Sequence, residues 1–141
     1  MIIVKNVTFD DENSKLVGAI RHDVFIREQG IDPELEFDGL DDRAIHALVY
    51  ADGVPVATGR ILDDGHIGRI AVLRKYRGQG LGEKVVLSLI NKAEEKGCSR
   101  VYLGSQTQAT NFYLKLGFAP YGSEFMEAGI PHIWMERLLQ E

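Results

Sequence analysis

Residues 70–90 read Ile-Ala-Val-Leu-Arg-Lys-Tyr-Arg-Gly-Gln-Gly-Leu-Gly-Glu-Lys-Val-Val-Leu-Ser-Leu-Ile, and this stretch decides the fold. Its first four residues are apolar and predict a buried strand. Residues 74–82 are basic and rich in glycine, which predicts a turn. From Leu81 to Ala93 the apolar residues recur at helical spacing. The stretch therefore predicts a strand, a turn and an amphipathic helix in succession.

The turn has the features of an anion-binding site. Gly78, Gly80 and Gly82 allow the backbone to approach a ligand closely. The first amides of the following helix lack intrahelical partners, and the helix dipole is positive at that end. Cationic side chains outnumber the single nearby acid, Glu83. These cations are Arg74, Lys75, Arg77 and Lys84.

Two familiar phosphate-binding motifs do not match the turn. A P-loop requires Gly-Lys-Ser/Thr so that a hydroxyl group can hold magnesium, but Glu83-Lys84-Val85 follows here. A dinucleotide-binding fingerprint requires a third glycine where Glu83 stands. An ordinary glycine-rich connection between strand and helix remains an alternative to an anion site.

Segment 77–82, Arg-Gly-Gln-Gly-Leu-Gly, resembles the [Gln/Arg]-x-x-Gly-x-[Gly/Ala] motif of the GNAT acetyltransferase superfamily. Segment 106–118 is similar to the second GNAT motif and follows it in the right order and spacing. Segments 21–29 and 128–135 resemble a branch of small stand-alone bacterial members, some related to glyphosate acetyltransferases. The resemblance covers nearly the whole chain. It implies that backbone amides of the turn hold the pyrophosphate of acetyl-CoA.

Composition indicates one soluble domain spanning residues 1–141. Hydrophobic residues make up 45% and charged residues 26%, a balance typical of globular proteins. The sequence pI of about 5.4 and the scattered acids argue against a nucleic acid or an anionic membrane as partner. We find no signal peptide or membrane-spanning apolar run, so we expect a cytoplasmic protein.

The order of elements predicts an α+β fold. We expect a single GNAT-like domain with a mixed, mostly antiparallel central sheet of about seven strands, flanked by helices, with a parallel pair around the crossover helix. An acid-rich loop at 29–42, long enough to suggest a binding role, separates the first helix from the next strands. The helices are predicted near 12–28, 78–96 and 109–116, and the strands at 2–8, 44–51, 54–62, 66–73, 100–103, 118–121 and 133–138.

The resemblance implies a set of coenzyme-binding residues. Backbone groups of the strand before the turn would pair with the pantetheine arm of the coenzyme as an added strand does. The full set is Ile70, Ala71, Val72, Arg77, Gly78, Gln79, Gly80, Leu81, Gly82, Gln106 and Phe112. The four histidines and the single cysteine show no ligand spacing, so we expect no metal.

Acetyl transfer to an amine also needs an acid and a base. The resemblance implies that Tyr113 protonates the departing thiolate, although its place on an apolar stripe also suits core packing. Candidates for the base are His132, which matches the histidine of the glyphosate-acetylating relatives, Glu28 and His46. His46 alternates with Leu48 and Tyr50, as a buried histidine would.

The acceptor is the least defined part of this prediction. Guanidinium groups pair well with carboxylates, so a substrate carboxylate has several candidate partners, any of which would also serve as an ordinary surface arginine. We predict acetyl transfer from acetyl-CoA to a small-molecule amine. The alternatives are a non-catalytic CoA-binding sensor and a protein-modifying acetyltransferase, and a homodimer is left open. The predicted acceptor-site residues are Arg21, Arg27, His46, Arg60 and Arg69.

Overall fold

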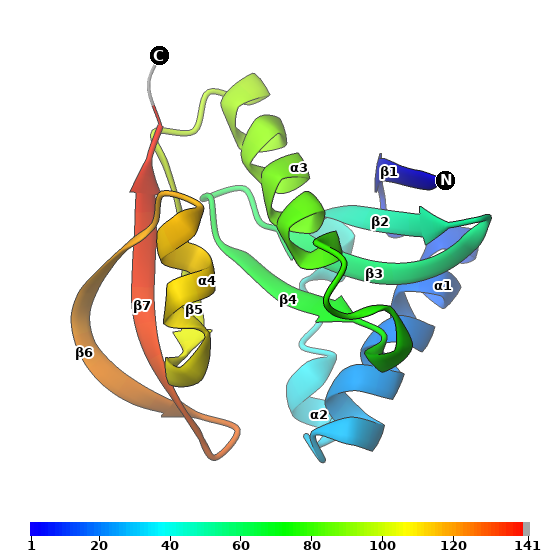
Figure 1. Cartoon of the computed structure of the whole chain (residues 1–141), viewed down its shortest axis with the longest axis horizontal. Helices are drawn as coiled ribbons and strands as arrows, with labels where there is room; N and C mark the ends of the chain where they lie inside the picture. The colour runs from blue at the N-terminus through cyan, green and yellow to red at the C-terminus, as the bar shows by residue number, and fades with distance from the viewer. Residues whose placement is uncertain (140–141) are drawn as a thin grey trace.

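Seven strands form two sheets that diverge from each other in the computed structural model, which describes residues 1–139 (Figure 1). The four-stranded sheet has the order β1-β2-β3-β4 and the three-stranded sheet the order β5-β7-β6. Neighbouring strands within each sheet are antiparallel. The strands are β1 (Ile2–Val7), β2 (Ile45–Ala51), β3 (Val54–Ile61), β4 (Ile67–Val72), β5 (Arg100–Gln106), β6 (Ala119–Glu127) and β7 (Ile130–Leu138).

The α+β prediction is confirmed. The structure differs in that the single central sheet expected from the sequence is divided into two sheets. The predicted parallel pairing of β4 with β5 is reduced to one bridge, between His66 and Tyr102. Beyond the bridge, β4 carries a bulge in which Arg69 and Ile70 lie opposite the single residue Gly59 of β3, and Arg69 has a φ of 55°. A bulge bends its strand, so β4 turns away from β5 and leaves space between the sheets.

Three of the four α-helices within residues 1–139 lie near the ranges that the sequence predicts, and the fourth is a single short turn inside the loop predicted at 29–42. The helices are α1 (Asp11–Arg21), α2 (Pro33–Glu36), α3 (Leu81–Glu95) and α4 (Thr110–Lys115). Residues His22–Glu28 continue α1 as a π-helix. Short 3₁₀ turns occupy Asp41–Arg43, Arg74–Tyr76 and Thr107–Ala109. None of these helices, within residues 1–139, is both long and apolar enough to cross a membrane.

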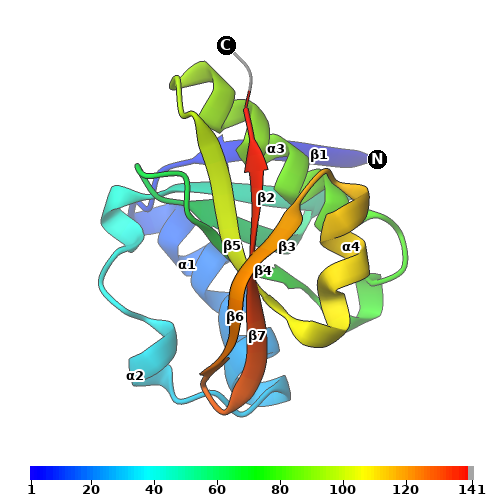
Figure 2. The same cartoon turned by 90° about the vertical axis from the view of Figure 1, so that its left-hand side faces the viewer.

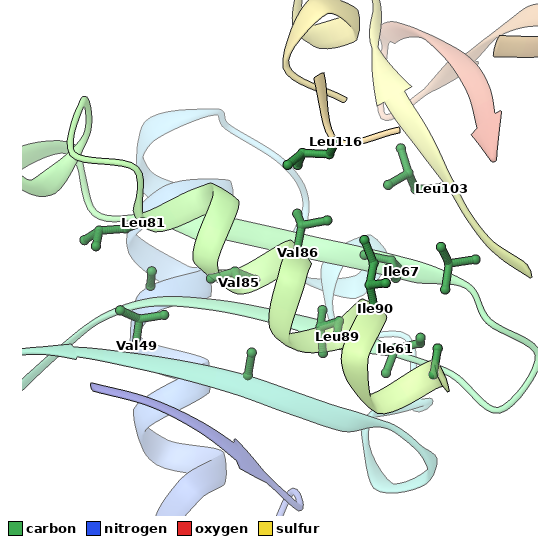
Figure 3. Packing of buried hydrophobic residues seen from close by; sticks show 14 of the residues in the cluster. Val49, Ile61, Ile67, Leu81, Val85, Val86, Leu89, Ile90, Leu103 and Leu116 are labelled. Atoms are coloured by element: carbon green, nitrogen blue, oxygen red, sulfur yellow. The ribbon is translucent and has the colours of Figure 1, made fainter. Parts of the chain in front are cut away.

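Helices α1 and α3 cover opposite faces of the four-stranded sheet (Figure 2). Alternation along β2 supplies both faces, because Ala47 and Val49 pack with α3 whereas Leu48 packs with α1. The buried face of α3 is the one that the helical spacing predicts (Figure 3). It consists of Leu81, Val85, Val86, Leu89, Ile90 and Ala93, each at most 2% exposed.

The last two strands are longer than the sequence predicts. Glycine and proline residues interrupt the strand pattern around β6 and β7. A prediction from local propensity therefore ends β6 too early, at 121, and starts β7 too late, at 133. Pairing between the strands extends them, and β7 begins at Ile130 rather than Ile133. His132 therefore lies inside β7, opposite Gln106 of β5.

The contact between β3 and α3 requires a glycine at position 59. A Cβ atom placed on Gly59 would lie 2.5 Å from a Cγ atom of Val85, closer than packing tolerates. We expect Gly59→Ala to lower the free energy of unfolding in urea by about 1–3 kcal/mol, the usual cost of overpacking a core. Gly18→Ala on α1, where no atom lies within 4 Å, is the control. Equal stability of the two variants would contradict this account of the β3–α3 contact.

Candidate active site

A cavity of about 520 Å³ lies along the end of β4 and the start of α3. Gly82 lines this cavity close to two side chains, because an added Cβ atom there would lie 3.4 Å from the Phe112 ring and 3.8 Å from Val72. The structure thus gathers most of the predicted coenzyme-binding residues around one hollow. Those that line it are Ile70, Ala71, Val72, Arg77, Gly78, Gly80, Leu81, Gly82 and Phe112.

The first turn of α3 presents free amides at this cavity. Gly80 caps the helix with a φ of 79°, a left-handed conformation that glycine adopts without strain. The first bond back to the cap runs from the Lys84 amide to the Gly80 carbonyl at 3.2 Å. The amides of the three residues between, Leu81–Glu83, have no intrahelical acceptor. Three amides at the positive end of a helix suit a phosphate group.

Arg77 and Glu28 form a two-pronged ion pair beside this cavity. The Arg77 nitrogens Nη1 and Nη2 donate to the Glu28 carboxylate at 2.5 and 2.7 Å, and Nε donates to the Val72 carbonyl at 2.9 Å. These hydrogen bonds lower the pKa of Glu28, which makes it a weaker base. Glu28 lies outside the cavity described next, so the structure argues against the prediction that it is the general base.

A second cavity, of about 280 Å³, fills the space where β4 and β5 diverge. Gln29 and Ile70 line both cavities, so the two adjoin at the bulge of β4. Gln106 belongs to this second cavity rather than to the first, and Gln79 lines neither. A group extending along β4 from the first cavity would therefore enter the second.

Tyr113 and His132 both line the second cavity. Tyr113 packs edge-on against Phe112 and Phe118, and burial raises the pKa of its phenol to about 12. The His132 ring is only 6% exposed, and its Nδ1 lies 2.7 Å from the Ile130 carbonyl oxygen. Because a carbonyl only accepts, Nδ1 carries a proton, and Nε2 is the nitrogen that can accept one.

Three of the predicted acceptor-site residues are buried away from the second cavity, and the structure does not bring them to it. Arg21 is fully buried, with Nε 2.6 Å from Glu36 Oε2 and Nη1 2.7 Å from Asp41 Oδ1. Arg60 joins the same network through Asp41 at 3.0 Å. His46 is 1% exposed and its Nε2 lies 3.1 Å from the Asp41 carbonyl. Burial lowers its pKa, which suits a neutral core histidine.

The remaining two predicted arginines differ from each other. Arg27 is exposed, pairs with Asp23 at 3.3 Å and does not line the second cavity. Arg69 does line it, at the bulge of β4. Its guanidinium already donates to the carbonyls of Glu36 and Leu35, at 3.1 and 3.2 Å, and contacts the Asp38 carboxylate at 3.2 Å. Only Arg69 of the five thus reaches the cavity, and its charge is balanced there.

Sequence reasoning missed six polar or aromatic residues that line the second cavity: Phe25, Gln29, Glu36, His66, Glu127 and Trp134. Trp134 could have been found from alternation, because Ile130, His132 and Trp134 are spaced two apart and all line the cavity. The strand was predicted to begin too late for this pattern to be recognised. No local signal identifies His66, since its position depends on the bridge to Tyr102.

A family model described as "Acetyltransferase (GNAT) domain" matches residues 21–139. YyaT of Bacillus subtilis strain 168 is 44% identical in an alignment of 140 positions, which covers 95% of this chain and 94% of YyaT. YjcF of the same strain, described as an uncharacterized N-acetyltransferase, is 37% identical over 138 residues, and the alignment covers 95% of this chain and 96% of YjcF. The crystal structure of an acyl-CoA N-acyltransferase from Pseudomonas aeruginosa superposes with a TM-score of 0.86 at 31% identity, covering 97% of this chain and 99% of that one. The chain belongs to the GNAT acetyltransferase family.

The buried arginine network supports the wall of the second cavity, because Glu36 and Arg69 both line it. Arg21→Met removes one charge and leaves two buried carboxylates short of a partner. We expect the free energy of unfolding to fall by about 3–5 kcal/mol in urea, as when other buried pairs are broken. Arg27→Met, at an exposed ion pair, should change it by less than about 1 kcal/mol. A similar small loss for both variants would contradict the structural role of Arg21.

Gly82 provides a test of the first cavity. A valine at this position would place its methyl groups in the gap between Phe112 and Val72. We expect Gly82→Val to weaken CoA binding by about tenfold or more in calorimetry, because the ligand would lose that space. Gly18→Val on α1 is the matched control, since Gly18 has open surroundings. Unchanged CoA affinity in Gly82→Val would remove the cavity as the coenzyme site.

Proposed function

We propose that this acetyltransferase transfers an acetyl group from acetyl-CoA to the amine of a small-molecule acceptor. The observation that carries the proposal is the junction of the two cavities at Ile70 and Gln29. One cavity presents the free amides of α3, and the other contains Tyr113 and His132. A donor held in the first cavity and an acceptor held in the second would meet at this junction.

The residues of the first cavity fit the coenzyme. The amides of Leu81–Glu83 would hold the pyrophosphate, and the backbone of β4 near Ile70 would pair with the pantetheine arm. Acetyl-CoA would supply the thioester that the acceptor amine attacks directly. The similarity to an acyl-CoA N-acyltransferase of P. aeruginosa supports this choice of donor.

His132 is the proposed general base. An alkyl ammonium group has a pKa of about 10.4 and must lose a proton before it can attack, and imidazole can accept that proton near neutral pH. The hydrogen bond of Nδ1 with the Ile130 carbonyl fixes the ring and leaves Nε2 as the accepting atom. Glu127, whose Oε2 lies 3.8 Å from Nε2, would stabilise the imidazolium that forms.

Tyr113 is the proposed general acid. Its phenol lines the second cavity and would give its proton to the departing thiolate. Burial raises the pKa of Tyr113 to about 12, so the phenol stays protonated over the whole working range. The raised value also makes the phenol a weaker acid, so the transfer requires the thiolate to develop close to the hydroxyl group.

The two proposed roles are tested by separate substitutions. In wild type, kcat/KM should not fall on the basic side below about pH 10, because Tyr113 stays protonated. His132→Ala should lower kcat by about 10² to 10⁴, because the amine then loses the group that accepts its proton. Tyr113→Phe should also lower kcat, because the thiolate then loses its proton donor. Both are measured by thiol release over a panel of amines.

The exposed His22 provides the control, since His22→Ala should leave rate and profile unchanged. Near-normal turnover of His132→Ala across the pH range would pass the role of base to a water chain. Tight CoA binding with no thiol release from any amine would favour a CoA-binding sensor instead. Modification of a basic protein is less favoured, because three acids of loop 29–42, Glu36, Asp38 and Asp41, are engaged in internal ion pairs.

A further inference from the structure

One wall of the second cavity is a row of aromatic rings. The His66 ring stacks on Tyr102 with centroids 4.7 Å apart, and it meets Trp134 edge-on at 5.9 Å. Trp134 stacks on Phe125 at 4.6 Å, and Phe125 stacks on His132 at 5.5 Å. His66, Trp134 and His132 of this row line the cavity. The row joins the residue before β4, His66, to all three strands of the second sheet.

A glycine makes room for this aromatic wall. A Cβ atom on Gly104 of β5 would lie 2.9 Å from Phe125 Cζ and 3.7 Å from Trp134 Cζ3. The rings therefore rest on the bare backbone of β5, and Gly104 itself lines the cavity. Partly exposed rings held in place against a cavity offer a flat apolar surface to a ligand.

The charge of the cavity is negative. Its charged lining residues are Glu36, Arg69 and Glu127. Arg69 and Glu36 belong to the network in which three arginines meet three carboxylates, so their charges are balanced. Glu127 lies outside that network, and its side chain is 59% exposed beside His132. Burial lowers the pKa of His66, so this imidazole stays neutral and does not balance Glu127.

We propose that the acceptor is an arylalkylamine, with its ring against Trp134 and His66 and its ammonium group toward Glu127 and His132. An aromatic ring gains contact area and favourable ring geometry from the wall, and the ammonium group gains the attraction of a carboxylate. An amino acid would bring a second carboxylate into a cavity that is already negative and whose only arginine is engaged. The role of this ligand as acceptor rests on the proposed function, but its binding does not.

Trp134 is the single tryptophan of the chain, so intrinsic fluorescence reports directly on this wall. The probes are 2-phenylethylamine, L-phenylalanine, which adds a carboxylate, and hexylamine, which lacks the ring. Each is titrated into the protein saturated with CoA. We expect 2-phenylethylamine to bind about tenfold more tightly than either of the others. Equal or tighter binding of L-phenylalanine or hexylamine overturns the proposal, as does no fluorescence change with 2-phenylethylamine.

Substitutions assign the two contacts. Trp134→Leu should bring the ratio of kcat/KM for 2-phenylethylamine over hexylamine close to one, and Trp134→Phe should restore most of the preference. Glu127→Gln should raise KM for 2-phenylethylamine about threefold to tenfold without changing CoA affinity. Glu124→Gln is the control, because it makes the same charge change on an exposed part of β6 outside the cavity. It should leave KM unchanged for both 2-phenylethylamine and hexylamine. A preference that persists in Trp134→Leu overturns the assignment of the wall.

The two proposals fail in different ways. Selective binding of 2-phenylethylamine without thiol release would contradict the acetyltransferase mechanism and leave the ligand assignment standing. Thiol release from all amines at equal kcat/KM would support the mechanism and overturn the arylalkylamine. The fluorescence titration and the thiol assay therefore separate them.

Discussion

The divergence of β4 from β5 is the constraint on which the site depends. The strands meet at one bridge, His66 to Tyr102, and a bulge at Arg69 and Ile70 then bends β4 away. A continuous parallel pairing would close the space between the sheets and satisfy the backbone groups of both strands with each other. The separation instead leaves a cavity and frees an edge of β4 to which a ligand can add. Backbone pairing between β4 and β5 is therefore limited to one bridge, and the second cavity lies beside this edge.

Two kinds of packing hold the sheets in this arrangement. Helix α3 fills the angle between them, since the apolar cluster on its buried face includes Leu103 of β5 and Met135 of β7 as well as residues of the first sheet. The buried network of Arg21, Arg60 and Arg69 fixes the loop that walls the cavity. Buried ion pairs carry a large desolvation cost, so their contribution to net stability is small. Their value here is geometric, because the directional hydrogen bonds of a guanidinium hold the loop in one position.

The two cavities differ in the charge of the ligand that each would favour. In the first cavity the amides of Leu81–Glu83 are the groups that suit an anion, since Arg77 is already paired with Glu28. Backbone amides in a helix terminus are fixed dipoles and need no reorganisation when a ligand binds. The second cavity has balanced charges in its loop wall and an unbalanced carboxylate at Glu127. An anionic donor would thus bind in the first cavity and a cationic acceptor in the second, and the two would meet at Ile70.

The sequence by itself determined the strand, turn and helix of residues 70–90, because glycines, helical spacing and local charge are properties of neighbouring residues. It also placed Tyr113 and His132 in the candidate site through resemblance. Only the tertiary structure decided which arginines are available, because the buried partners of Arg21 and Arg60 come from a loop twenty residues or so away along the chain. The same holds for His66 and Trp134, which meet across two sheets. Contacts of this kind depend on how the strands diverge, and no local pattern records that divergence.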